Sequence, residues 1–208
     1  MAHMNRLPDE NAFRRHAAEE AVAHLGLLKP GAVETVFRLL DNSDGSHPRA
    51  ICTAYRKRGA QLQDGEKKAA GIRKSAFMSH AALAEITAKG MRDPLRAHEL
   101  TILRGSFAIV RHRNALSAER MMQEYSDLPI EVQYDVFHPE SCSVCNALYR
   151  KTVGPDWGLF APDGCICITA PYGLHIHADF IGELVVKEER QRQSAKLPLL
   201  ARIKQIFR

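Results

Sequence analysis

The sequence lacks the long apolar runs and the secretion signal that would place it in a membrane or outside the cell. None of its apolar runs approaches the roughly 20 residues that a membrane-spanning helix needs. Its N-terminus also lacks the apolar segment typical of a signal peptide. We therefore expect a cytoplasmic protein with no transmembrane segment. Because Met4 closely follows Met1-Ala2-His3, we expect residues 1–4 to be an added leader rather than native sequence.

Several short catalytic motifs are also absent. The sequence contains neither a Walker-type glycine loop nor a dinucleotide-binding glycine pattern. His98-Glu99 is not followed by the second histidine of the H-E-x-x-H motif of zinc proteases. No H-x-E motif accompanies a P-C-x-x-C pair, as a nucleobase deaminase would require. These absences argue against the corresponding enzyme classes.

Positive charge exceeds negative charge only slightly, but the basic residues are clustered. The 208 residues include 29 Lys and Arg against 24 Asp and Glu, a formal net charge of +5. This excess permits a polyanionic partner, either nucleic acid or an acidic protein, without requiring one. One cluster offers a candidate phosphate-facing surface. Its members are Arg56, Lys57, Arg58, Lys67, Lys68, Arg73 and Lys74.

Helical patterns dominate residues 5–127, which we predict to form a helical region. Apolar residues recur at three- and four-residue spacing in 10–28 and 33–40, which predicts a helical hairpin. Ser79 is a suitable cap for a helix that ends at Gly90, and Asp93-Pro94 starts another. We expect Gly105 to break or kink this last helix, with a further helix capped by Ser117. Residues 51–58 fit either a strand or a helix.

The pattern changes to β structure after residue 127. Apolar and polar residues alternate through 130–136, as in a strand with one buried face. Residues 165–170 and 173–186 look like two further strands around a tight turn. We expect residues 128–190 to form a small antiparallel β module and residues 191–208 a basic amphipathic helix. The predicted fold class is therefore α+β.

Four of the five cysteines form the strongest chemical signal in the chain. Cys142 and Cys145 make a C-x-x-C pair, and after 19 intervening residues Cys165 and Cys167 make a C-x-C pair. A C-x-x-C turn directs two sulfurs to one ion, and residues two apart on a strand project from the same face. In a chain without a secretion signal, this pattern favours metal ligation over disulfides. The sequence predicts a structural zinc site with four thiolate ligands.

Histidines near the second cysteine pair leave a rival ligand set open. His175 and His177 follow as H-x-H, and a hairpin turn at 170–172 would set Cys167 opposite His175 and Cys165 opposite His177. That register would allow a Cys2His2 site or a second ion with an open position. His138 is a further alternative ligand.

Two functional hypotheses follow from these features. The first is a zinc-stabilised binding protein that engages nucleic acid or an acidic protein through its basic surfaces. The second is a nuclease-like, zinc-dependent hydrolase, with His175, His177, Asp179 and His138 as candidate catalytic residues. The two hypotheses differ in whether the histidines or only the cysteines hold metal.

Overall fold

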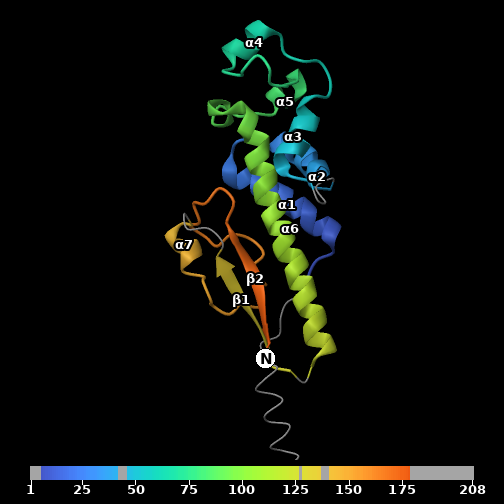
Figure 1. Cartoon of the computed structure of the whole chain (residues 1–208), viewed down its shortest axis with the longest axis vertical. Coiled ribbons are helices and arrows are strands. Elements are labelled where there is room, and N and C mark those ends of the chain that lie inside the picture. Colours follow the sequence, from blue (N-terminus) through green and yellow to red (C-terminus); the bar gives the residue numbers. More distant parts are fainter. Residues whose placement is uncertain (1–5, 42–45, 127, 137–140, 179–208) are drawn as a thin grey trace, which may run out of the picture.

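A single 31-residue helix, α6 (Pro94–Glu124), runs along most of the protein and packs against both its helical part and its sheet (Figure 1). The computed structural model describes residues 6–41, 46–126, 128–136 and 141–178. Within these residues the fold is α+β, with seven α-helices and one two-stranded antiparallel sheet. The predicted helix at 191–208 lies outside the described residues.

The predicted helical hairpin is confirmed, and it packs on α6. It consists of α1 (Glu10–Leu25) and α2 (Val33–Asp41), joined through the short 3-10 helix η1 (Pro30–Ala32). The side chain of Asp9 caps α1, accepting hydrogen bonds from the backbone N–H groups of Asn11 and Ala12. The buried alanines of α1 leave room for close contact with α6.

The remaining helices of this part are short and lie beyond the hairpin at one end of the protein (Figure 1). They are α3 (Pro48–Arg56), α4 (Asp64–Ala69) and α5 (His80–Ala84), and the 3-10 helix η2 (Gly90–Arg92) precedes α6. The ambiguous segment at 51–58 is thus helical through Arg56. The helix predicted to reach Gly90 instead ends at Ala84. Backbone hydrogen bonds join Lys29 N–H to Glu85 O and Thr87 N–H to Leu27 O, so this stretch pairs with the chain after α1.

The break predicted at Gly105 is wrong, because α6 continues through it without interruption. Gly105 is buried, and a Cβ atom added there would lie 2.8 Å from Cδ1 of Leu40 on α2. The missing side chain therefore permits close packing of two helices and does not introduce a bend. The separate helix predicted from Ser117 is the last part of the same α6.

Glu85 is the centre of a hydrogen-bonded network that joins α2, α3 and α6. Its carboxylate accepts hydrogen bonds from Thr35 Oγ1 at 2.6 Å and Tyr55 Oη at 2.9 Å, and Nε2 of the fully buried His98 lies 2.9 Å away. Burial favours a raised pKa for Glu85, but the contacts with His98, Thr35 and Tyr55 outweigh it, so the pKa is lowered. Burial and the bond to Glu85 also raise the pKa of Tyr55 to about 12.

The sheet consists of β1 (Ile130–Val136) and β2 (Tyr172–Ala178). The strand predicted at 130–136 is confirmed, and the strand predicted at 173–186 is described as far as residue 178. Residues 165–170 are not a strand, which corrects the predicted hairpin. The other edge of β1 forms backbone hydrogen bonds with residues 150–153; for example, Val153 N–H donates to Val132 O. The face of β2 that carries Leu174 packs towards α6.

Replacing Glu85 with glutamine tests the network. We expect Glu85→Gln to lower the free energy of unfolding at pH 7 by about 2 kcal/mol, because donors that served a carboxylate lose their charged acceptor. The matched control is Glu19→Gln, at an exposed position on α1, which we expect to change stability by less than about 0.5 kcal/mol. Urea unfolding of both variants measures the difference.

The pH dependence of this difference has a defined sign. Because the pKa of Glu85 is lowered on folding, its stabilising contribution is present above the unfolded-state pKa of about 4.3. The contribution is lost as the pH falls through the folded-state pKa. We therefore expect the stabilities of wild type and Glu85→Gln to converge as the pH falls below the unfolded-state pKa and through the lower folded-state pKa. A difference that stays constant from pH 7 to pH 3 would contradict this account.

Candidate metal centre

The first cysteine pair is placed by the four-residue helix α7 (Ser143–Asn146). Cys142 is the N-cap residue of α7 and Cys145 lies within it, so both thiols belong to one tight turn. The turn is closed by a 2.9 Å hydrogen bond from Asn146 N–H to Cys142 O. The Asn146 side-chain amide also donates to Ser141 O at 2.9 Å. This local structure explains why residues three apart in the sequence direct their sulfurs to the same place.

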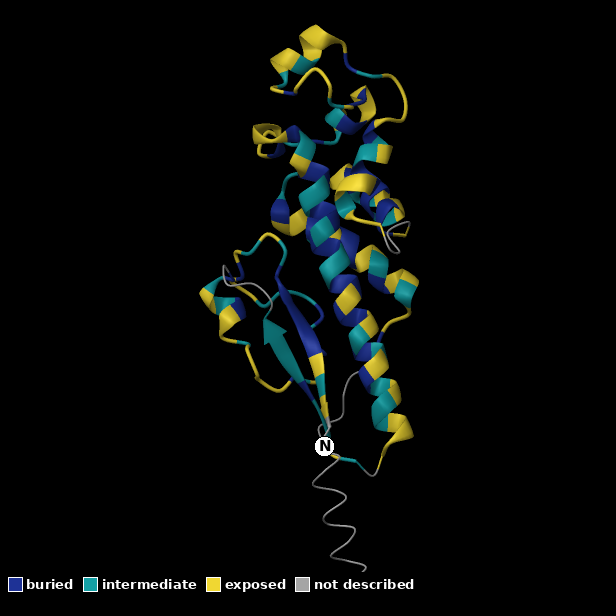
Figure 2. Ribbon diagram, in the orientation of Figure 1, coloured by how far each residue is buried: buried dark blue, intermediate teal, exposed yellow. Residues whose placement is uncertain are grey.

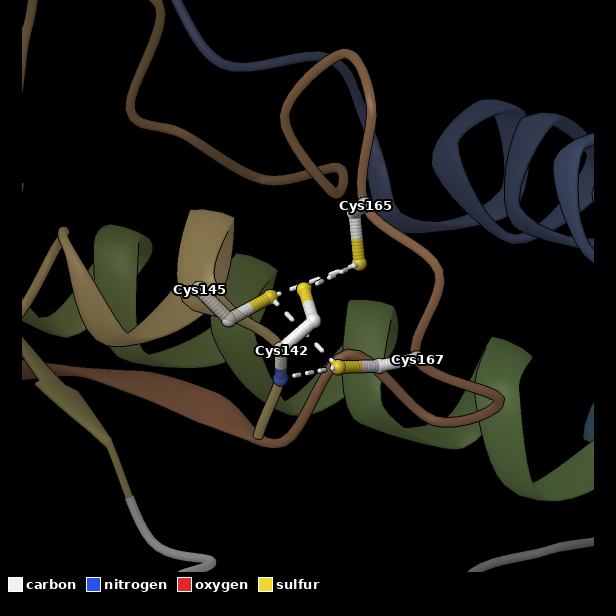
Figure 3. Close-up of side chains that lie close together, drawn as sticks. All are labelled: Cys142, Cys145, Cys165 and Cys167. Atoms are coloured by element: carbon white, nitrogen blue, oxygen red, sulfur yellow. Dashed lines mark hydrogen bonds between the residues drawn. The ribbon is translucent and has the colours of Figure 1, made fainter. Parts of the chain in front are cut away.

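The second pair lies in the loop that leads into β2. A turn closed by Cys165 N–H and Pro162 O introduces Cys165, and Cys167 follows two residues later. Cys145 and Cys165 are buried, while Cys142 and Cys167 are partly exposed. Figure 3 shows the four sulfurs directed towards one another from the two segments.

The four sulfurs have the spacing of a metal-ligand set. All lie within 4.8 Å of one another. The sulfur of Cys145 is 3.3 Å from that of Cys165 and 3.9 Å from that of Cys167, and Cys142 and Cys165 are 4.0 Å apart. A tetrahedral zinc site with Zn–S bonds of about 2.3 Å requires sulfurs about 3.8 Å apart. A disulfide would need about 2.05 Å. The four thiols are therefore close enough to hold a metal ion, in an arrangement consistent with zinc.

Backbone N–H groups favour a negative charge at this cluster. The N–H group of Cys145 is the main cause that lowers the pKa of the Cys142 thiol to about 6, which favours its thiolate form. Cys142 N–H itself donates to the Cys167 sulfur at 3.1 Å. Burial and the neighbouring Cys165 thiol raise the pKa of Cys145. A bound cation would supply the positive charge that thiolates crowded at this distance require.

The structure does not bring the candidate histidines to the cysteines. His175 lies opposite Gln133 and His177 opposite Glu131, which corrects the predicted pairing with Cys167 and Cys165. Both histidines are exposed, on the face of β2 opposite the buried Leu174. Among the described residues, the four cysteines are the one group with the composition and spacing of a metal site. The other candidates, His138 and Asp179, lie outside the described residues.

Two buried arginines of α6 anchor the cysteine loop. Arg104 donates from Nη1 to Cys167 O at 2.8 Å and Ile168 O at 3.2 Å, and it forms an ion pair with Glu20 of α1 at 2.6 Å. Arg111 donates to the carbonyl groups of Leu159, Ala170 and Tyr172. In a strand, the backbone carbonyls of this loop would bond to a neighbouring strand. Here they bond to the arginines instead, which explains why 165–170 is not a strand.

These two arginines are the positioning residues that sequence reasoning missed. Arg104 and Arg111 lie seven residues apart, which is about two helical turns, so they share one face of α6. Ala97, Ala108 and Ala115 lie on that buried face as well. The sequence does contain a signal that could have identified them: two arginines lie within an otherwise apolar face of a predicted helix, which indicates buried arginines with hydrogen-bond partners.

The candidate nucleic-acid contacts divide into one buried and six accessible residues. The side chain of Arg56 is only 5% exposed, and its Nη2 lies 2.8 Å from Glu99. We therefore remove Arg56 from the exposed contacts, because Glu99 and the Leu95 carbonyl occupy its guanidinium. The other six lie directly after α3, on α4 and in the loop that follows α4, where Figure 2 shows many exposed residues. These six residues, here named the basic surface, are Lys57, Arg58, Lys67, Lys68, Arg73 and Lys74.

Comparison of the chain with models of known protein families, with curated proteins and with solved structures found no match. Among the described helices, none has the length and apolar character needed to cross a membrane. The site's own geometry is therefore the basis for the functional argument.

Metal analysis of purified variants tests the ligand set. We expect wild type to contain about one zinc ion per chain, and Cys142→Ser/Cys145→Ser to contain almost none, because two of four thiolates are lost. His175→Ala/His177→Ala should retain the wild-type zinc content. Elemental analysis after extensive dialysis measures the metal in each protein.

Cys52 provides the control for loss of a cysteine elsewhere. It is fully buried among helices, outside the four-cysteine group, so Cys52→Ala should keep its zinc. Zinc lost or halved in the histidine variant would contradict the four-cysteine assignment. Wild-type protein that takes up no zinc when refolded with the metal would contradict the site itself.

Replacing Arg104 tests the link between the helices and the metal loop. We expect Arg104→Met to lower the free energy of unfolding by about 3 kcal/mol, because Glu20 loses its buried partner and two carbonyls lose their donor. The same variant should release zinc faster to a chelator. The matched control is Arg113→Met, which breaks a half-exposed ion pair with Glu10 on the same helices and should cost about 1 kcal/mol or less. Equal losses in the two variants would contradict the anchoring role.

Proposed function

We propose that this is a zinc-stabilised nucleic-acid-binding protein. In this proposal Cys142, Cys145, Cys165 and Cys167 hold one zinc ion with a structural role, and the basic surface contacts phosphate groups. A set of four thiolates completes the tetrahedral coordination of zinc, which leaves no position for water or substrate. The metal centre would then order the loop into β2 rather than carry out chemistry.

The segregation of charge is the observation that carries the binding function. Residues 56–80 contain seven Lys and Arg against two acidic residues, a formal net charge of +5 that equals the excess of the whole chain. The basic surface formed by this segment lies at the end of the molecule that is distant from β1 and β2 (Figure 1). One ion pair within it, Lys74 with Asp64 at 2.7 Å, is highly exposed and contributes little to neutralisation in solution. Such a concentration of cations attracts phosphates.

Nucleic acid is favoured over an acidic protein partner by one aromatic side chain. Phe77 is 46% exposed, and Lys57 Nζ lies 4.5 Å from the centre of its ring. Exposed aromatic rings among cations stack on bases in proteins that bind nucleic acids. An acidic protein surface would be attracted by the positive charge but would have no base to stack on the ring.

The hydrolase alternative has no support among the described residues. His175 and His177 lie on an exposed strand face opposite Gln133 and Glu131. They form no group with a third described residue that could hold a metal. The exposure of both side chains is typical of histidines on the solvated face of a sheet.

Oligonucleotide binding at several salt concentrations tests the proposal. We expect wild type to bind a labelled oligonucleotide with an affinity that falls steeply as salt rises. Arg58→Gln/Lys68→Gln should weaken binding by about tenfold and flatten the dependence of log K on log salt, because two phosphate contacts are lost. Fluorescence anisotropy gives both quantities.

The charge-matched control is Arg120→Gln/Lys151→Gln. Both residues are exposed and lie outside the basic surface, on α6 and in the segment beside β1. We expect this variant to bind nearly as wild type does. Equal effects of the two double variants would indicate an unspecific response to net charge and contradict the proposal.

A further inference from the structure

A groove of about 670 Å³ lies between α3, the loop at 73–77 and the first turns of α6. Three exposed arginines line it, one from each segment: Arg49, Arg73 and Arg96. None of the three forms an ion pair with another described residue. The segments that supply them are far apart in sequence, so the fold itself collects these charges.

The acidic side chains of the groove do not neutralise these arginines. Glu99 is engaged by Arg56, whose Nη2 lies 2.8 Å from it. Asp93 is the N-cap of α6, and its carboxylate accepts a hydrogen bond from the backbone N–H of Arg96. Arg56 has a further donor, Nε, that is buried without a hydrogen-bond partner in the described structure. The groove therefore carries more positive charge than its two carboxylates neutralise. It also has an arginine N–H donor without a hydrogen-bond partner among the described residues.

Apolar surface accompanies this charge. Phe77 lines the groove together with Pro48, Leu100 and Leu103. Because Lys57 Nζ lies over the ring of Phe77, the groove is continuous with the basic surface. A ligand with repeated negative charges and flat apolar rings would satisfy both kinds of lining. A compact anion would use only the arginines.

We infer that this groove binds single-stranded nucleic acid, with Arg49, Arg73 and Arg96 on the phosphates and Phe77 against a base. The inference deepens, and rests on, the proposed nucleic-acid function. A concave site with an exposed ring accommodates one strand whose bases are unpaired, because stacking on a side chain requires a free base face. In a duplex the neighbouring base pairs already cover those faces. The strand would leave the groove over Lys57 and continue along the basic surface.

The test uses the full-length protein and 12-nucleotide probes: labelled single strands of DNA and RNA, and a duplex of the same sequence. We expect tighter binding to a single strand than to the duplex. Arg49→Gln/Arg96→Gln, two residues outside the basic surface, should weaken single-strand binding about 10- to 100-fold. The salt dependence should flatten by about 1.4 in log K per log salt, which corresponds to two lost contacts to a single strand.

A second variant separates stacking from charge. Phe77→Ala should weaken single-strand binding by about fivefold or more while leaving the salt dependence unchanged, because no phosphate contact is removed. Arg120→Gln/Lys151→Gln again serves as the charge-matched control, since Arg120 lies about 36 Å along α6 from Arg96. Circular dichroism and thermal unfolding verify that each variant is folded.

The outcomes distinguish this inference from the function on which it rests. Preference for the duplex, or unchanged binding by folded Arg49→Gln/Arg96→Gln, would overturn the groove assignment. If Arg58→Gln/Lys68→Gln still weakened binding in that case, the proposed function would stand without the groove. If wild type bound none of the probes, both would be overturned.

Discussion

The fold depends on the two buried guanidinium groups of α6. Arg104 connects Glu20 of α1 with the carbonyls of Cys167 and Ile168. Arg111 donates to the carbonyls of Leu159 and Ala170, which lie before and after the second cysteine pair. Removing a guanidinium from water is costly unless nearly all of its donors are used. Here carbonyl oxygens and one carboxylate supply the acceptors, and the ring of Tyr172 lies 4.4 Å from the Arg111 guanidinium carbon. The position of the cysteine loop on the helices follows from this requirement.

The thiol cluster that could hold a metal and the packing of the helices are therefore connected through backbone groups. The carbonyl of Cys167 binds Arg104, while its sulfur accepts a hydrogen bond from Cys142 N–H. One residue thus belongs to the thiol cluster through its side chain and to the helical part through its main chain. The helices restrict where the second cysteine pair can lie, which reduces the conformational entropy that an ion would have to remove if it bound there.

What could be predicted from sequence depended on how local each interaction is. The C-x-x-C turn is closed by hydrogen bonds between residues four and five apart, so its geometry could be predicted. The strand predicted at 165–170 failed because its carbonyls bond to arginines about 60 residues earlier. Arg56 was placed on the surface because its partner Glu99 is 43 residues away. Gly105 was expected to weaken a helix, whereas its missing side chain admits Leu40. In each of these failures, a distant contact determined the local structure.

The arginine anchors also affect how relatives of this chain could be recognised. They hold main-chain carbonyls, which every residue has, so a side chain such as that of Ile168 can diverge without loss of these bonds. The donors cannot diverge in this way, because a lysine lacks the planar array of five N–H groups. Homologues with little overall identity would thus be expected to share two arginines seven apart on a long helix, followed by a C-x-x-C and a C-x-C pair. That spaced pattern is a more selective search criterion than the cysteines alone.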